Sequence, residues 1–171
     1  KVMGLACYGK INPEFYNELR ELIWIENGHI IEKEVLKKNK VVEKLTRYKI
    51  KEGQDFLEVA DIAFTGQKYF EDILLEFLNI CYEKHPNKNL LFGGGCALNS
   101  KANGLIIKNT PFEKLHIYSA PSDDGNALGA AYLSFLSMGG KKDNLKLLTP
   151  YLGSNFEQDK LYKLNKYGWG N

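Results

Sequence analysis

Two consecutive strand–turn–helix units constrain the fold of this 171-residue chain more than any other feature. In the first unit, the mostly apolar residues 89–92 precede three glycines, and residues 99–108 have the pattern of a helix. In the second, residues 114–120 are the predicted strand, PSDDG is the turn, and residues 126–138 are the helix. This alternation is typical of a parallel α/β sheet. Ligands of open α/β sheets bind beyond the carboxyl ends of the strands, so we expect both turns to lie together there.

Upstream of these units, the sequence predicts an entry loop and a β-hairpin. Residues 1–10 contain two glycines and are predicted to form a loop that enters the domain. In residues 21–36, two apolar runs flank Asn27-Gly28, a pair that tolerates the positive φ angles of a type I′ turn. This arrangement predicts two antiparallel strands joined by a tight turn.

A long helix is predicted between the hairpin and the first strand–turn–helix unit. Asp55 is expected to cap it, with Glu58 three residues later completing a capping box. Apolar residues then recur at helical spacing as far as Cys81, and the sequence HPNK ends the helix. Gly66 interrupts good helix formers at a cost of about 1 kcal/mol relative to alanine, which would be tolerated if another element packs closely against it.

Composition and charge narrow the choice of partners. Apolar residues make up 44% of the chain and the formal net charge is +2, which provides no strong field to attract nucleic acid or an anionic membrane. No apolar run approaches the roughly 20 residues that a membrane helix needs. The three cysteines are too scattered for a disulfide framework or a metal pair, so we expect a cytoplasmic location. Cys96 is expected to be a small buried residue.

Gly93, Gly94 and Gly95 separate the first predicted strand from its helix. Bare backbone N–H groups at a helix start favour an anion, and the lack of Cβ atoms lets a base or a phosphate approach closely. A nucleotide is therefore the natural ligand. However, neither GxxxxGK[ST] nor GxGxxG is present. Taken alone, the glycines are equally compatible with a tight turn that only permits close packing.

Two adjacent acids, Asp123 and Asp124, lie in the second turn, at the start of its predicted helix. Carboxylates are favoured there by the helix dipole, so both can serve as helix caps. Carboxylate oxygens at the end of a strand can also hold a hard cation. A single carboxylate is not a metal site, and the chain contains no HxxxH, HxH or HExxH motif. Any metal bound here must take its other ligands from elsewhere.

Four stretches together resemble one protein family. KVMGLACYGK, ADIAFTGQKYFEDIL, NLLFGGGCALNSKANGLI and APSDDGNALGAAYLSF are similar, in order and spacing, to the O-carbamoyltransferases of nodulation-factor and antibiotic type. The resemblance covers residues 1–152. It implies an α/β fold, the C-terminal lobe of an actin-like ATPase domain of the acetate and sugar kinase, heat-shock and actin group, with a mixed sheet and flanking helices. It also implies that the other lobe lies upstream and that residues 153–171 begin a linker to an acceptor-binding domain.

The resemblance further implies an activity for the complete enzyme. Members of this family use ATP and carbamoyl phosphate to form a carbamoyl-adenylate, and then transfer the carbamoyl group to a hydroxyl of a sugar or natural product. A divalent metal ion, iron or Mg/Mn, lies near the phosphates and takes histidine ligands from the first lobe. This chain by itself is expected to be inactive and to form a homodimer through its exposed cleft face, because exposed apolar surface promotes association.

Family motifs assign roles to individual residues of this chain. The glycine turn is expected to cradle the adenosine and its α-phosphate, with Asn99 as a polar partner at the start of the next helix. Gln67 matches the glutamine of the DIAxxxQ helix and is expected near the nucleotide. Asp123 matches a metal ligand, and Asp124 takes the neighbouring place beside the nucleotide. No catalytic residue is assigned.

Two other functions stay open. A relative that makes threonylcarbamoyl-adenosine in tRNA would share the nucleotide-binding lobe, although the SDDG turn and the KVMGLACYGK entry favour the O-carbamoyltransferases. A non-catalytic actin-like ATP switch, similar to the heat-shock chaperone ATPases, would use the same glycine turn and act through partner proteins. Two histidines four residues apart in the first lobe would favour carbamoyl transfer over a switch.

Overall fold

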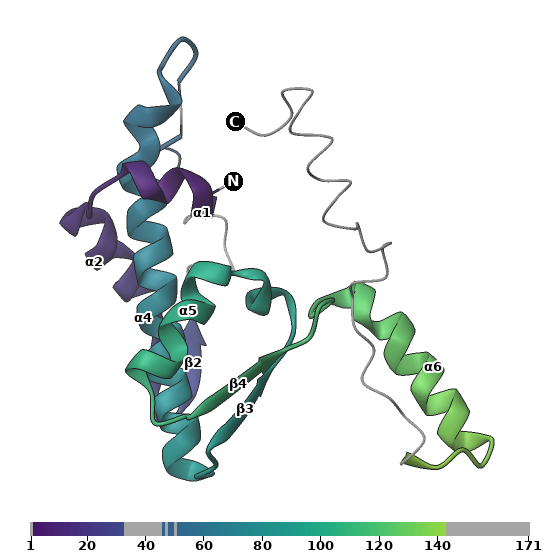
Figure 1. Ribbon diagram of the computed structural model, residues 1–171. Helices are drawn as coiled ribbons and strands as arrows, with labels where there is room; N and C mark the ends of the chain where they lie inside the picture. The colour runs from purple at the N-terminus through teal and green to yellow at the C-terminus, as the bar shows by residue number, and fades with distance from the viewer. Residues whose placement is uncertain (1, 33–45, 47, 50, 143–171) are drawn as a thin grey trace, which may run out of the picture. The chain divides into compact units, whose positions relative to one another are not determined.

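The computed structural model describes residues 2–32, 46, 48–49 and 51–142 (Figure 1). The chain divides into two compact units, Lys1–Gly125 and Asn126–Asn171. The helices of the first unit are α1 (Val2–Leu5), α2 (Pro13–Leu22), α4 (Ala60–Lys84) and α5 (Ser100–Asn109), with the short 3-10 helices η1 (Ala6–Tyr8), η3 (Phe56–Val59), η4 (Gly95–Leu98) and η5 (Asp123–Gly125). Its strands are β1 (Ile23–Glu26), β2 (His29–Glu32), β3 (Asn89–Phe92) and β4 (Lys114–Ile117). The second unit contributes α6 (Asn126–Ser137).

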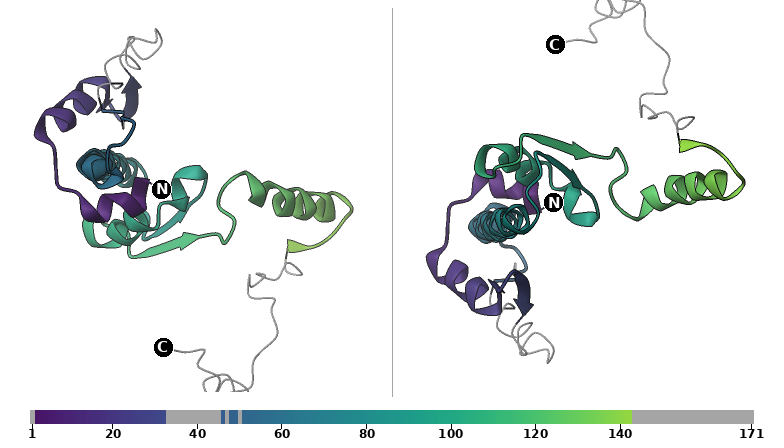
Figure 2. Two further views of the ribbon diagram at one scale, coloured as in Figure 1. Left: turned by 90° about the horizontal axis from the view of Figure 1, so that it is seen from above. Right: turned by 90° about the horizontal axis from the view of Figure 1, so that it is seen from below.

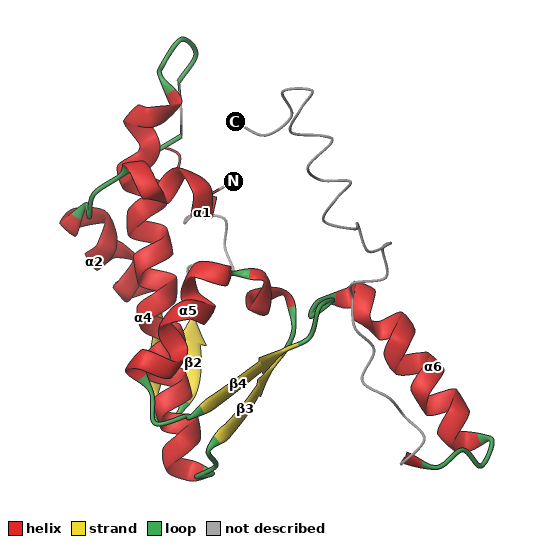
Figure 3. Cartoon of the chain, viewed as in Figure 1, coloured by secondary structure: helices red, strands yellow, loops and turns green. Residues whose placement is uncertain are grey.

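The described residues form a mixed α/β structure in which short sheets accompany longer helices (Figure 3). Strands β3 and β4 pair in parallel, with Asn89 opposite Lys114 and Phe92 opposite Ile117. The parallel strand–turn–helix pattern is thereby confirmed, although β4 ends at Ile117 rather than at the expected residue 120. The finer expectation, a lobe of an actin-like ATPase, stays a prediction.

The predicted hairpin is also confirmed. Strands β1 and β2 pair antiparallel, and the turn between them has φ angles of 53° at Asn27 and 77° at Gly28. Positive φ at both central residues is the geometry that the Asn-Gly pair favours. The last residues of the predicted second strand, 33–36, lie outside the described residues.

Helix α4 is the centre of the first unit. Seen end on, it has α1, α2 and α5 arranged around it (Figure 2). One face of α4 forms a core with α5 and the parallel strands, and this core contains Leu74, Leu78, Leu90, Phe92, Ala102, Ile106, Phe112 and Leu115. Ile106 has an exposed fraction of 0%, and burying a side chain of this size contributes about 1.5–3 kcal/mol. The core therefore fixes α5, whose start adjoins the glycine turn.

The predicted entry loop is wrong, because residues 2–8 are helical and pack on the start of α4. The backbone N–H of Lys10 donates to Asp61 Oδ1 at 2.7 Å, and that of Asn12 donates to Thr65 Oγ1 at 2.8 Å. Thr65 is completely buried. Side chains of α4 thus satisfy the backbone of the entry segment, a tertiary effect that ten residues of sequence do not reveal.

Helix α2 is absent from the sequence-based expectations, although its start carries a recognisable signal. The Asn12 side chain accepts a hydrogen bond from the backbone N–H of Phe15 at 3.0 Å, and Pro13 occupies the first turn. The helix docks on α4 through the Tyr16 hydroxyl, which donates to Asp72 Oδ2 at 2.6 Å. Burial, together with this carboxylate, raises the pKa of Tyr16 to about 12.

Helix α4 itself begins later than expected. Asp55 accepts from the backbone N–H of Leu57 at 2.9 Å and so caps η3, while α4 starts at Ala60. No close packing offsets the helix cost of Gly66 within the described residues, since a Cβ at this position would meet none of their atoms within 4 Å.

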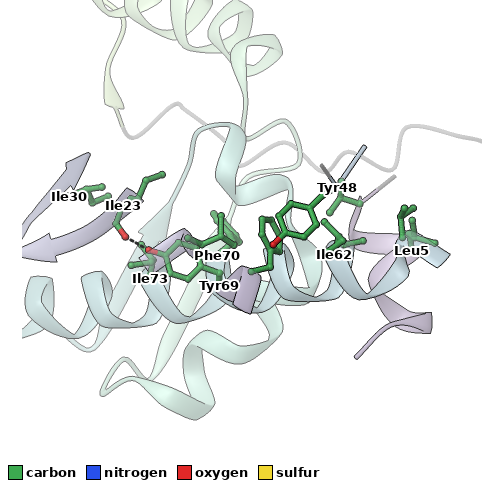
Figure 4. A pocket seen from close by; sticks show the side chains of 14 residues that line it. Leu5, Ile23, Ile30, Tyr48, Ile62, Tyr69, Phe70 and Ile73 are labelled. Carbon is green, nitrogen blue, oxygen red and sulfur yellow. Dashed lines mark hydrogen bonds between the residues drawn. The ribbon is translucent and has the colours of Figure 1, made fainter. Parts of the chain in front are cut away.

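Gly66 instead lines an apolar hollow of about 620 Å³ (Figure 4). The walls come from α1, α2, the hairpin, η3, α4 and Tyr48, and include Leu5, Ile23, Ile30, Ile62, Phe70 and Ile73. The Tyr69 hydroxyl, which also borders the hollow, donates to the carbonyl oxygen of Ile23. A surface made of aliphatic and aromatic side chains offers no charge to a phosphate, so the hollow is not the candidate nucleotide site.

Helix α6 confirms the predicted helix of the second strand–turn–helix unit, and Gly139, with a φ of 89°, follows its end. The predicted domain boundary at residue 152 and the linker 153–171 lie outside the described residues. None of the helices in the described ranges unites the length and the apolar character that crossing a membrane requires.

Candidate functional site

The two turns that follow β3 and β4 lie side by side. The backbone N–H of Gly94 donates to the carbonyl oxygen of Pro121 at 2.6 Å. A Cβ built on Gly95 would come to 3.8 Å from Ser122 Oγ. Because β3 and β4 are parallel, both turns leave the sheet at the same edge, as Figure 1 shows. The expected meeting of the glycine turn and the SDDG turn is therefore confirmed.

The glycines of these turns fall into two classes. Gly94 has a φ of 89°, a value that side chains disfavour, and a Cβ on Gly125 would lie 2.2 Å from the carbonyl oxygen of Ala120. Backbone geometry or packing therefore requires glycine at both positions. Gly93 and Gly95 are exposed, have no positive φ, and would place a Cβ no closer than 3.8 Å to the neighbouring atoms of the described residues. Within the described residues, packing does not require glycine at either position.

The glycine turn continues through η4 into α5. The backbone N–H of Ala97 donates to the carbonyl oxygen of Gly94 at 3.0 Å, and Ala97 is buried. Asn99 then caps α5, because its Oδ1 accepts from the backbone N–H of Ala102 at 3.1 Å. One turn later, Asn103 Nδ2 donates to the carbonyl oxygen of Ala97 at 2.7 Å. Hydrogen bonds within η4 and from α5 thus hold the glycine turn to the start of α5.

Gln67 and Asn99 lie together and form a reciprocal amide pair. Gln67 Nε2 donates to Asn99 Oδ1 at 3.1 Å, and Asn99 Nδ2 donates to Gln67 Oε1 at 2.9 Å. Gln67 is 4% exposed, so it is not a surface helix glutamine. Its second amide proton is used by Glu71, whose Oε1 accepts at 2.8 Å. In the part of the chain that the structure describes, Asn99 Nδ2 donates this one hydrogen bond, although an amide nitrogen can donate two.

Sequence reasoning missed two members of this group, Glu71 and Lys101. Glu71 is 4% exposed, and Lys101 Nζ lies 3.3 Å from its Oε1. The one available signal was the spacing of Gln67 and Glu71, four residues apart and hence on one face of α4.

Asp123 and Asp124 are both exposed and form η5 with Gly125. The backbone N–H of Gly125 donates to the carbonyl oxygen of Ser122 at 3.0 Å, which closes this short turn. Within the described ranges, no group of three or more His, Cys, Asp and Glu side chains is placed to hold a metal ion. A cation held by Asp123 would therefore need ligands from beyond these residues.

Two further residues border the glycine turn. Cys96 is exposed, so the expectation of a buried cysteine is wrong; its neighbour Ala97 occupies the buried position of η4 instead. Met3 of α1 accepts a hydrogen bond on Sδ from Ser100 Oγ at 3.7 Å. The entry segment thus reaches the first residue of α5, beside the turn.

Comparison with known proteins identifies the relatives of this arrangement. A family model described as the carbamoyltransferase N-terminus matches residues 1–132, which contain both turns, Gln67 and Asn99. The chain belongs to the carbamoyltransferase family. The family resemblance inferred from the four sequence stretches is thereby confirmed.

Individual relatives agree with this assignment. The uncharacterized protein MJ1058 of Methanocaldococcus jannaschii is 37% identical over 180 residues, covering 99% of this chain and 28% of the relative. Nodulation protein NolNO of Sinorhizobium fredii is 27% identical over 99% of this chain and 25% of its own length. Nodulation protein NolO of Bradyrhizobium diazoefficiens is 26% identical over 99% of this chain and 31% of its own length. The chain therefore spans less than a third of each of these relatives.

Proposed function

We propose that this carbamoyltransferase chain forms one wall of an ATP site in an enzyme that makes a carbamoyl-adenylate from ATP and carbamoyl phosphate. The carbamoyl group then passes to a hydroxyl of a sugar or natural product. The family assignment and the similarity to nodulation proteins support carbamoyl transfer, and the bare, exposed glycine turn supports the nucleotide.

The main support for a nucleotide site here is the open space where side chains would lie at Gly93 and Gly95. Both glycines are exposed, and a Cβ on either would come no closer than 3.8 Å to the described part of this chain. Intramolecular packing thus does not explain them, whereas close approach of a flat base or a phosphate does. The turn also precedes α5, whose dipole favours negative charge at this end. We place the adenosine and α-phosphate against this turn, with Asn99 donating its remaining amide proton and Gln67 holding Asn99.

Positioning and charge stabilisation are what these residues would supply. Hydrolysis of carbamoyl phosphate releases inorganic phosphate and leaves carbamate, which is a weak electrophile. The carbamate oxygen then bonds to the α-phosphorus of ATP as pyrophosphate leaves, so that the carbamoyl carbon carries AMP as a better leaving group. Holding two anionic reactants together requires aligned donors and screening of charge. We assign the donors to the glycine turn and Asn99, and place Asp124 beside the nucleotide.

Asp123 is the proposed metal ligand of this chain. The fit is partial, since Asp123 offers an exposed carboxylate and its further ligands would come from outside the described residues. A bound divalent cation, iron or Mg/Mn, would supply Lewis acidity and charge neutralisation. Asp123 would offer its carboxylate from the PSDDG turn, whose backbone accepts a hydrogen bond from Gly94.

The reaction is tested by isotope exchange between pyrophosphate and ATP in the complete protein that contains this chain. We expect exchange that requires carbamoyl phosphate, because adenylate formation is reversible only when the carbamoyl donor is present. Turnover of ATP to ADP without carbamoyl phosphate would contradict the proposal and favour the ATP switch.

Replacing Asp123 by asparagine is expected to raise the metal concentration for half-maximal exchange about tenfold, because a charged ligand becomes neutral. The matched control is Asp55→Asn, at an exposed cap of η3 where asparagine serves equally well. This metal concentration is measured by metal titration of the exchange reaction in the two variants and in the unchanged protein. Equal midpoints in all three would remove Asp123 from the metal site.

A further inference from the structure

Glu71 is a buried carboxylate beside the candidate nucleotide site. It lies on α4 with 4% of its surface exposed, and its Oε1 accepts from Gln67 Nε2 at 2.8 Å. Lys101 Nζ, on the first turn of α5, lies 3.3 Å from the same oxygen, and its side chain is 39% exposed. Burying a carboxylate is costly unless it is paired and hydrogen-bonded. Glu71 satisfies both conditions, and its partners are the residues that hold the start of α5.

The orientation of the amide pair depends on this carboxylate. Two amides that bond reciprocally can both turn over and bond equally well, so Gln67 and Asn99 alone leave two arrangements. An ionised carboxylate only accepts hydrogen bonds, and therefore requires Gln67 to present Nε2 to Glu71. The same nitrogen then donates to Asn99 Oδ1, and Gln67 Oε1 accepts from Asn99 Nδ2.

Only one of the two arrangements caps α5. Asn99 Oδ1 accepts from the backbone N–H of Ala102 at 3.1 Å. In the reversed arrangement, Asn99 would direct its NH₂ group at this N–H, and two donors would face each other. The cap would be lost, and the free amide proton of Asn99 would no longer have its present direction.

We infer that Glu71 is a positioning residue: through Gln67 it selects the Asn99 orientation that caps α5 and holds the glycine turn ready for a nucleotide. The inference rests on the proposed ATP site. Glu71 is buried and bonds to Gln67 and Lys101, so we assign it an action through these partners and not on the substrate. The positive charge of Lys101 balances the carboxylate. The amides of Gln67 and Asn99 pass on the hydrogen-bond direction that Glu71 sets.

The variant Glu71→Gln tests this inference in the complete protein. Glutamine keeps the size of the side chain but both donates and accepts, so it no longer selects one orientation of Gln67. ATP affinity is measured by how well ATP protects Cys96, exposed within the glycine turn, from alkylation, quantified by mass spectrometry. The exposed Cys7 of the same molecules is the internal reference. We expect half-protection to need about tenfold more ATP, equivalent to about 1.4 kcal/mol.

A swapped pair separates orientation from simple packing. In Gln67→Glu combined with Glu71→Gln, one carboxylate oxygen accepts from Asn99 Nδ2, which leaves Oδ1 on the Ala102 N–H. The other carboxylate oxygen turns away from Asn99 Oδ1 and accepts from the amide introduced at position 71. We expect this double variant to restore the ATP concentration for half-protection to within about twofold of the unchanged protein. Glu113→Gln, which removes a glutamate paired with Lys88 at 2.7 Å on the surface, is the control and should change nothing.

The outcomes are distinct. A Glu71→Gln protein that binds ATP normally, or a swapped pair no better than Glu71→Gln alone, would overturn the inference. If ATP fails to protect Cys96 even in the unchanged protein, the proposed function fails instead. The inference is then decided by the alkylation rate of ligand-free Cys96, which we expect to rise about threefold in Glu71→Gln as the cap loosens, and to return in the swapped pair. An unchanged rate would overturn it.

Discussion

Replacing Gly93 and Gly95 together by alanine is expected to weaken ATP binding about 100-fold, equivalent to about 2.7 kcal/mol, without lowering stability. Each new methyl group fits against this chain, because a Cβ would lie 3.9 Å from Pro121 O at Gly93 and 3.8 Å from Ser122 Oγ at Gly95. The same methyl groups would occupy the surface that the base and α-phosphate are proposed to touch. In the unfolded chain, alanine restricts the backbone more than glycine does, which favours the folded state by up to about 1 kcal/mol at each position.

Protection of Cys96 by ATP and the thermal midpoint of the complete protein, measured on the same samples, check this prediction. The control is Gly66→Ala, at a glycine of α4 that lines the apolar hollow and has no atom of the described residues within 4 Å of a built Cβ. It should leave ATP protection unchanged and raise the midpoint slightly, because alanine favours a helix. Unchanged ATP protection in the double variant would mean that the glycine turn touches no nucleotide.

Local sequence patterns predicted those parts of the fold that short-range chemistry determines. The Asn27-Gly28 pair predicted its tight turn, and the spacing of apolar residues predicted strand β3 and helix α4. The parallel pairing of β3 with β4 followed from the alternation of strand and helix. The entry segment failed because residues 2–8 pack on α4 and the backbone just after them bonds to Asp61 and Thr65, about fifty residues further along the chain.

The candidate site was predictable to the same extent. Its residues were found by family motifs, and the structure brings Gln67 and Asn99 into contact and joins the two turns through Gly94. Which glycines serve packing was not predictable, since this depends on how closely the folded backbone brings other atoms, such as Ala120 O at Gly125. Glu71 was missed because a glutamate on a long helix is usually a solvated residue, and only the position of α5 makes it buried.

The second large expected effect is a loss of stability at a glycine that close packing requires. Gly9 ends η1, and a Cβ there would lie 2.1 Å from the carbonyl oxygen of Ala60 and 2.8 Å from the backbone N of Asp61. These neighbours are backbone atoms of α4 and have no rotamer by which to move away. We therefore expect Gly9→Val to lower the free energy of unfolding by about 3 kcal/mol, because η1 must separate from α4.

Gly4→Val provides the matched control, in the same entry segment but with no atom within 4 Å of a built Cβ. Chemical unfolding of the complete protein and hydrogen exchange of residues 2–12 should distinguish the two, with rapid exchange only in Gly9→Val.

Separation of η1 would also break the Lys10–Asp61 hydrogen bond and withdraw Met3 from Ser100 at the start of α5. Gly9→Val should therefore raise the alkylation rate of Cys96 as well, although Gly9 lies far from Cys96 in the sequence. Normal stability in Gly9→Val would show that the entry segment does not pack on α4 as described, and the support it gives to the glycine turn would be lost with it.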